Sequence, residues 1–270
     1  MTAADPSPGG PGTGATPEIG CHRDGPVLRI TLNRPHVLNA VTETVLRDLA
    51  DLITEAGEDP DVRVIVLAGA GRAFSSGADL TTVTEISSPA GTIHAANRVI
   101  RSITAVPQPV VAAVQGPAAG VGCSIALACD LVLASSDAFF QLAFVKVGLM
   151  PDGGATLLVP AGIGRARAMY LSLLGDRLPA TTAAEWGLIH RVADPAALVA
   201  DVDDLATRLS RAAPLALAAT KRAVNAATLG GLEDSMRREL DGQSALLTSA
   251  DFQTAVAAFR EKQTPTFAGR

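Results

Sequence analysis

Short, mostly apolar runs alternate with longer segments of helical periodicity along the first two thirds of the chain. Such runs, bounded by polar or turn residues, are typical of buried strands. Between residues 42 and 58, apolar side chains recur at helical spacing, which predicts a helix. Two further helices are predicted at residues 90–104 and 124–129. The predicted strands are residues 27–32, 64–68, 109–114 and 131–134.

The chain after Pro195 shows helical periodicity only. Pro214 suits the first turn of a helix, where its missing N–H has no partner to lose, and Asp251 is predicted to be an N-cap. These amphipathic segments have too little core of their own to bury, so we expect them to contact other subunits. The predicted helices are residues 196–212, 214–227, 232–247 and 251–262.

Residues 110–134 form a long apolar stretch that Gln115, Gly116, Pro117 and Asp130 interrupt. We therefore expect a buried strand followed by a buried helix, and no membrane span. Hydrophobic residues make up 48% of the chain and charged residues 18%, which is typical of a globular protein. The net charge of −5 argues against nucleic acid as a partner, because binding phosphates requires a basic face.

The cysteines and the N-terminal segment indicate the cellular compartment of the protein. Cys21, Cys123 and Cys129 have no metal-ligand spacing, and their odd number indicates free thiols in a reducing compartment. Residues 1–18 are rich in Pro, Gly, Ser and Thr, and they lack the cationic start and apolar segment of a signal peptide. We predict a disordered tail and a cytoplasmic protein.

Two glycine-marked turns follow predicted strands. One is G-P-A-A-G-V-G-C-S-I-A-L-A-C-D at residues 116–130, which leads into a helix of small residues. The other is R-A-F-S-S-G-A-D-L at residues 72–80. Turns of this kind present backbone N–H groups to a ligand, and two of them at strand ends can direct two amides at one oxygen, which stabilises a developing oxyanion.

Three further segments carry a family resemblance: N-R-P-H-V-L-N-A at 33–40, P-Q-P-V-V-A-A-V-Q-G at 107–116 and A-E-W-G-L-I at 184–189. Together with the two turns, they resemble the crotonase, or enoyl-CoA hydratase/isomerase, family over residues 20–265. The resemblance implies an α/β fold with a ββα spiral core at residues 19–195. It also implies a C-terminal helical region, residues 196–270, that assembles homotrimers or homohexamers.

The resemblance further implies a site for an acyl-CoA substrate, with no permanently bound cofactor and no metal. The oxyanion amides would be those of Ala78 and Val121, and a backbone N–H survives any substitution except proline. The implied CoA contacts are Arg34, Ser76 and Lys262. Lys262 could equally be a solvated residue at the end of a helix, with no contact to CoA. The implied acyl-pocket residues are Leu80, Val83, Ser124, Phe144 and Leu149.

Hydratases of this family use two carboxylates, but the matching positions here hold Ser124 and Phe144. Asp152 is the replacement candidate, because it matches the catalytic acid of the family's Δ3,Δ2-enoyl-CoA isomerases and ring-opening isomerases. One carboxylate suffices to move a proton from C2 to C4 of a 3-enoyl thioester. Its position between Pro151 and a glycine pair also suits a helix cap, which is the reading that spacing alone favours.

Other functions remain open at this point. Residues 122–126, G-C-S-I-A, nearly match the nucleophile elbow of serine hydrolases, with His190 following Asp152 in chain order. A dehalogenase would need a histidine at the helix position near Asn97, which is not a histidine, and the neighbouring His94 is better explained as an exposed helix residue. A non-catalytic acyl-CoA-binding protein would keep both turns and use Asp152 only as a cap. We expect an enoyl-CoA isomerase, with enoyl-CoA hydratase as the alternative.

Overall fold

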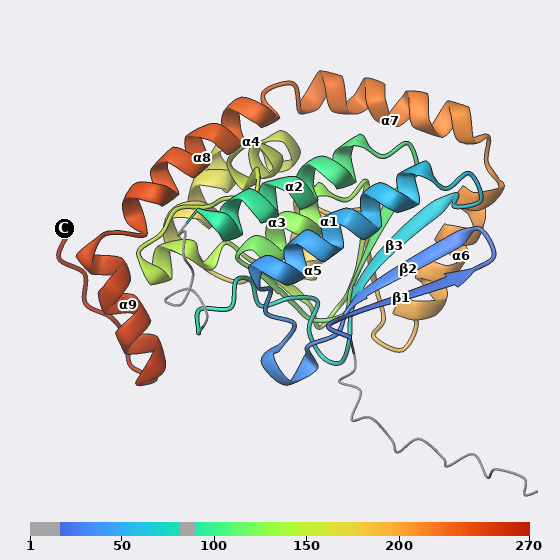
Figure 1. The fold of residues 1–270 in the computed structure, drawn as a ribbon. Helices are drawn as coiled ribbons and strands as arrows, with labels where there is room; N and C mark the ends of the chain where they lie inside the picture. Colours follow the sequence, from blue (N-terminus) through green and yellow to red (C-terminus); the bar gives the residue numbers. More distant parts are fainter. Residues whose placement is uncertain (1–16, 82–89) are drawn as a thin grey trace, which may run out of the picture.

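The computed structural model describes residues 17–81 and 90–270 (Figure 1). The predicted tail therefore lies almost wholly outside the described residues, as does Val83 of the predicted acyl pocket. The described helices are α1 Glu43–Glu58, α2 Gly91–Ala105, α3 Val121–Ala128, α4 Ala155–Leu174, α5 Ala180–Trp186, α6 Leu198–Arg211, α7 Pro214–Thr228, α8 Leu232–Leu246 and α9 Ala250–Arg260, with short 3-10 turns η1 Pro35–Val37 and η3 Ala143–Val147.

The described strands form two sheets. The larger sheet has the order β1-β2-β3-β4-β6-β9, in which β1 and β2 are antiparallel and every later pair is parallel. The smaller sheet has the order β5-β7-β8. The strands are β1 Ile19–Asp24, β2 Val27–Leu32, β3 Val64–Gly69, β4 Val110–Val114, β5 Pro117–Ala119, β6 Leu131–Ser135, β7 Phe139–Gln141, β8 Leu178–Pro179 and β9 Arg191–Ala193.

Successive strands step from one sheet to the other, which gives the predicted ββα spiral. Strand β4 of the larger sheet leads to β5 of the smaller sheet and then to α3. Strand β6 likewise leads to β7 and on to α4. Helix α3 starts two residues after β5, whereas η3 and a loop separate β7 from α4.

The centre of the larger sheet, strands β3, β4 and β6, is buried on both faces, which explains why these parallel strands have no polar face. Ile65 and Leu67 of β3 face a core formed with α1, α2 and α3. Val64 and Val66 point the other way and pack against Leu198, Val202 and Ala206 of α6. Side chains alternate across a strand, so both sets of positions must be apolar.

The C-terminal helices lie on different parts of the molecule (Figure 1). Helix α6 covers one face of the larger sheet, and α8 packs against α2 and α4 at the end of the molecule far from β1 and β2. Pro214 begins α7 as predicted. The predicted N-cap Asp251 is wrong, because Ser249 caps α9 by accepting from the Phe252 N–H at 3.1 Å. Asp251 instead accepts from the amides of the C-terminal segment, Ala268 and Gly269.

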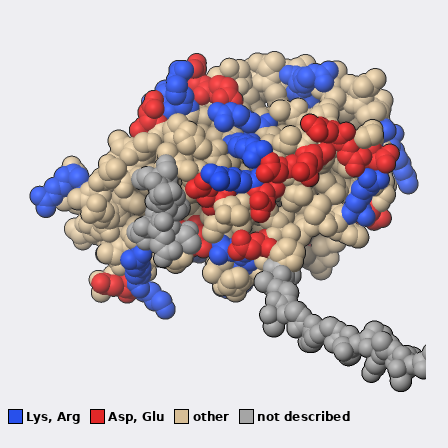
Figure 2. All heavy atoms as spheres, in the orientation of Figure 1, with Lys and Arg blue, Asp and Glu red and all other residues tan. Residues whose placement is uncertain are grey.

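Within residues 17–81 and 90–270, none of the helices is both long enough and apolar enough to cross a bilayer. The stretch at 110–134 divides into β4, β5, α3 and β6, as its interruptions indicated. On the face drawn in Figure 2, side chains of Lys and Arg lie among those of Asp and Glu. Charges of both signs are therefore mixed over this face.

Candidate active site

The two glycine turns run side by side. Ser75 and Ala118 form a parallel β-bridge, and the Ala119 N–H donates to the Ser75 carbonyl at 2.9 Å. The contact extends to the two glycines, since a Cβ on Gly120 would lie 3.6 Å from the Gly77 Cα, and Ala78 and Val121 directly follow these glycines. The sequence motifs that predicted each amide separately are thus joined by one parallel contact.

Glycine is required where the turns touch. Gly77 has φ of 96° and Gly120 has φ of 53°, conformations that L side chains rarely adopt. A Cβ on Gly77 would lie 2.9 Å from the Ala119 oxygen and 3.4 Å from the Gly120 Cα. The close approach of the two backbones therefore depends on the missing side chain.

Neither of the two predicted oxyanion amides is paired within the described part of the chain. Val41 bonds to the residues on either side of Ala78, accepting from the Asp79 N–H and donating to the Gly77 carbonyl. In a parallel bridge this pattern turns the N–H of Ala78 away from Val41. Val121 is the first residue of α3, where an amide has no partner within the helix. Among the described residues, neither amide donates to a protein acceptor.

Asp152 lies against the first turn of α3. The Ser124 hydroxyl donates to the Asp152 carbonyl at 2.7 Å. A Cβ on the next residue, Gly153, would lie 2.9 Å from the Ser124 Cβ and 3.6 Å from a Val121 methyl carbon. The structure therefore brings Asp152 next to the residue that carries the second amide.

The Asp152 carboxylate is buried and only half satisfied. Its Oδ2 accepts from the Gln243 Nε2 at 2.8 Å, while Oδ1 has no hydrogen-bond partner. Burial raises the pKa of Asp152 to about 7, and the hydrogen bond from Gln243 opposes this rise while the charge of Glu239 adds to it. An unpaired carboxylate oxygen with a pKa near neutrality can accept and return a proton.

The alternative that Asp152 is a helix cap is wrong. Helix α4 begins at Ala155, and no side chain of its N-cap residue, Gly154, is available. Glu239 on α8 caps the helix instead, since its carboxylate accepts from the Gly154 N–H at 2.7 Å and the Thr156 N–H at 2.8 Å. The Asp152 carboxylate therefore does not cap α4.

The nucleophile-elbow alternative also lacks its parts. Ser124 is fully buried, and its hydroxyl donates a hydrogen bond to the Asp152 carbonyl. His190 is exposed and lies next to β9, where its N–H donates to the Val132 carbonyl. A nucleophilic serine needs a base within hydrogen-bond reach, and Ser124 has none among the described residues.

The remaining predicted pocket residues that the structure describes are uncharged, and their place in an acyl pocket stays a prediction. Phe144 belongs to η3 and is buried in the core, and the Leu149 N–H donates to its carbonyl at 3.0 Å. Leu80 is partly buried and follows the turn of Ala78 and Asp79. The two positions at which hydratases carry carboxylates, Ser124 and Phe144, are thus occupied by a hydroxyl and an aromatic ring.

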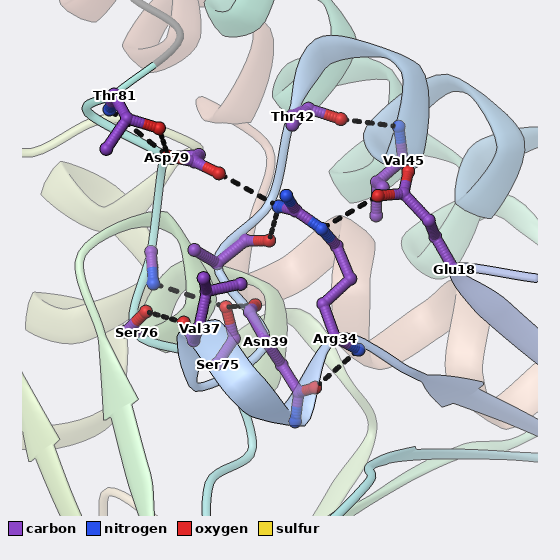
Figure 3. A network of polar contacts seen from close by, with 12 residues as sticks. Glu18, Arg34, Val37, Asn39, Thr42, Val45, Ser75, Ser76, Asp79 and Thr81 are labelled. Carbon is purple, nitrogen blue, oxygen red and sulfur yellow. Dashed lines mark hydrogen bonds and ion pairs between the residues drawn. The ribbon is translucent and has the colours of Figure 1, made fainter. Parts of the chain in front are cut away.

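Arg34 lies in a polar network that ties the turn of Ala78 to the start of the chain (Figure 3). Its Nη1 contacts the Asp79 Oδ2 at 3.0 Å and the Ala40 carbonyl at 2.6 Å, while Nε is 2.8 Å from a Glu18 oxygen. Burial acts to raise the pKa of Asp79, but hydrogen bonds from Thr81 and Arg34 outweigh it and lower that pKa. Two carboxylates already compensate the guanidinium, and a CoA phosphate contact by Arg34 stays a prediction.

The other two predicted CoA contacts are Ser76 and Lys262, which belong to different parts of the chain. Ser76 is partly buried, and its N–H donates to the Leu38 carbonyl at 2.9 Å while its hydroxyl donates to the Val37 carbonyl. Lys262 is exposed just beyond α9. Both contacts remain predictions. Within the described residues, no group of three or more His, Cys, Asp or Glu side chains is placed to hold a metal ion.

Sequence reasoning missed Glu239 and Gln243, the α8 side chains that meet the Asp152 loop. With Ser235 they recur every fourth residue and form a buried polar stripe on α8. A polar stripe at this spacing is more typical of the solvent face of a helix. The only signal in the sequence was that these positions lack large apolar residues. That signal indicated a solvent-exposed face, and so it pointed away from the site.

Comparison with known proteins agrees with this geometry. The family model described as enoyl-CoA hydratase/isomerase matches residues 22–270. The 1,2-epoxyphenylacetyl-CoA isomerase of Escherichia coli is 38% identical, over 92% of this chain and 97% of that protein. A probable enoyl-CoA hydratase of Rhodobacter capsulatus is also 38% identical, over 89% and 94%. The crystal structure of an enoyl-CoA hydratase from Mycobacterium avium subsp. paratuberculosis has a TM-score of 0.88 at 48% identity, covering 94% of this chain and all of that one.

The fold, the two turns and these matches define a crotonase-type enzyme. The chain belongs to the enoyl-CoA hydratase/isomerase family. The match to residues 22–270 confirms the resemblance seen in the motifs across almost the whole chain. Enzymes of this family act on CoA thioesters.

Proposed function

We propose that the protein is an enoyl-CoA isomerase that shifts a double bond from the Δ3 to the Δ2 position with Asp152 as its one proton carrier. The observation that carries this proposal is the buried, unpaired Oδ1 of Asp152, next to the helix turn that begins with Val121. The Escherichia coli relative, named for the isomerisation of an epoxide, supports isomerisation as the class of reaction.

The reaction balances with one acid. The carboxylate Oδ1 of Asp152 takes a proton from C2 of a 3-enoyl thioester, and the electron pair moves through the C3–C4 double bond and the carbonyl. The N–H groups of Ala78 and Val121 hold the negative charge on the dienolate oxygen. The same proton then returns at C4, which leaves a 2-enoyl thioester and an ionised Asp152.

The alternative, enoyl-CoA hydratase, has the support of relatives that carry this name. Hydration needs a base for water and an acid for the substrate carbon. Glu239 is the second buried carboxylate near Asp152, but three donors of the α4 start occupy it: the N–H groups of Gly154 and Thr156, and the Thr156 hydroxyl. The site therefore offers one carboxylate where hydration calls for two.

We expect the purified enzyme to convert 3-enoyl-CoA to 2-enoyl-CoA at least about 100-fold faster than it hydrates crotonyl-CoA, since each missing proton carrier costs about 10²–10⁴-fold. Both rates can be followed on the same preparation by the absorbance of the conjugated thioester. Hydration as fast as isomerisation would contradict the proposal and favour the hydratase alternative.

We further propose a homotrimer or homohexamer of a cytoplasmic enzyme. The second half of α4 carries four large apolar side chains that are 40–61% exposed: Met169, Tyr170, Leu173 and Leu174. Neighbouring apolar side chains in such numbers are typical of a surface that another subunit covers. Light scattering of the full-length protein is expected to give three or six times the mass of one chain, and a stable monomer would refute the assembly.

A further inference from the structure

Two side chains from the C-terminal helix α8 meet the loop that carries Asp152. Gln243 is 1% exposed and Glu239 is completely buried. Burying an amide and a carboxylate costs free energy unless both are hydrogen-bonded. Their partners lie in the segment from Met150 to Thr156, so α8 is connected to the proposed catalytic acid by polar contacts as well as by packing.

The Gln243 amide can be oriented in only one way. Its Oε1 accepts from the Met150 N–H at 3.3 Å, and a backbone N–H can only donate. The Nε2 must therefore face the other partner, the Asp152 Oδ2, to which it donates at 2.8 Å. Because one oxygen is held in this way, the second oxygen, Oδ1, is the one left for a substrate proton.

Glu239 acts on the same loop from one turn earlier on α8. By accepting from the N–H groups of Gly154 and Thr156, it fixes the backbone directly after Asp152. Its charge disfavours ionisation of Asp152, whereas the Gln243 hydrogen bond favours ionisation. From the other elements that pack here, α3 presents the uncharged Ser124 to Asp152, and α2 presents Ile100 to Gly154. Of the described residues, Glu239 is the titratable neighbour whose charge acts on Asp152. Burial raises the pKa of Glu239 itself, against the hydrogen bonds from Thr156 and Gly154 and the charge of Arg238, which favour its ionised form.

We propose that Gln243 and Glu239 are positioning residues that hold Asp152 with Oδ1 free and set, in opposite directions, the pH at which it becomes an active base. This inference rests on the proposed function of Asp152. It gives α8 a part in the chemistry, in addition to any part in assembly.

The test is the pH dependence of kcat/KM for 3-enoyl-CoA isomerisation, which reports ionisation in the free enzyme. The unmodified enzyme is expected to lose activity below about pH 7, where Asp152 becomes protonated. Gln243→Met keeps the side-chain volume but removes the hydrogen bond that favours the carboxylate, so the acid limb should move up by about one pH unit, or about tenfold in rate on that limb. Most of the activity should return at higher pH.

Glu239→Gln should move the acid limb in the opposite direction, to lower pH, because it removes a neighbouring negative charge. It also weakens the cap of α4, so a lower Tm is expected alongside the shift. Gln253→Met, the same replacement at an exposed position of α9, is the matched control and should leave the profile unchanged. A structural defect would lower the rate at every pH. It would not move the acid limb of Gln243→Met to higher pH and that of Glu239→Gln to lower pH.

The outcomes separate the inference from the function on which it rests. Equal losses at all pH values in Gln243→Met, or shifts of both variants in the same direction, would overturn the inference while Asp152 remains the acid. Retained isomerisation in Asp152→Asn would overturn the proposed function itself. If Glu239→Gln does not fold, Gln243→Glu, which has nearly the same shape but adds a negative charge beside Asp152, must raise the acid limb further than Gln243→Met does.

Discussion

Asp152→Asn is expected to lower isomerisation of 3-enoyl-CoA by at least about 10³-fold, within the range that a single acid–base group supplies. An amide at position 152 can still accept from Gln243 through its oxygen, so the loop should keep its shape. Its remaining NH₂ group cannot take a proton from C2. Acyl-CoA affinity should stay within a few-fold of the original, and kinetics together with a binding titration measure both quantities.

The same substitution should stabilise the fold at neutral pH. The pKa of Asp152 in the folded protein, about 7, lies above its unfolded value. Between the two pKa values the unfolded state ionises while the folded state stays protonated, so the original protein loses stability as the pH rises through this window. Asp152→Asn should therefore gain roughly 2–4 kcal/mol in unfolding free energy above pH 7, and the gain should vanish near pH 4.

The exposed Asp137 provides a matched control for both measurements. Asp137→Asn removes the same charge from a surface turn and should change neither turnover nor the pH dependence of stability. Unchanged turnover in Asp152→Asn would remove the proton carrier from the mechanism. Lost turnover without a pH-dependent gain in stability would show that Asp152 is ionised at little cost, contrary to its burial.

Four strands of the larger sheet, β2, β3, β4 and β6, were predicted because short apolar runs mark them, as Val64, Ile65, Val66 and Leu67 of β3 illustrate. Strands β1 and β9 were not predicted, since β1 is mostly exposed and β9 is only three residues long. The smaller sheet was missed, because its strands are only two or three residues long and show no periodicity. Helix α4 was missed as well. Its sequence is apolar around most of its circumference and contains Pro160, and its backbone breaks at Gly164, so no amphipathic face marks it.

The candidate site divides in the same way. Local turn chemistry indicated two amides directed at one oxygen, and the family resemblance assigned them to Ala78 and Val121. How the two turns lie together depends on the Ser75–Ala118 bridge between distant segments. The spacing around Asp152 favoured a helix cap, and only the position of Glu239, more than eighty residues later in the chain, shows why the cap is supplied from elsewhere. Long-range contacts of this kind leave little trace in a single sequence.

Val121→Pro should lower kcat by at least about 10²-fold, the typical effect of losing one oxyanion donor. The structure makes this a favourable test, because Val121 is the first residue of α3, where proline is well tolerated and no helical hydrogen bond is lost. Val121→Ala is the matched control, since it also loses the branched side chain but keeps the N–H, and it should retain most of the activity. Circular dichroism and CoA binding establish that both variants are folded. If folded Val121→Pro turned over substrate as fast as Val121→Ala, the oxyanion would have to lie away from this amide, and the proton transfer assigned to Asp152 would lose the group that stabilises its intermediate.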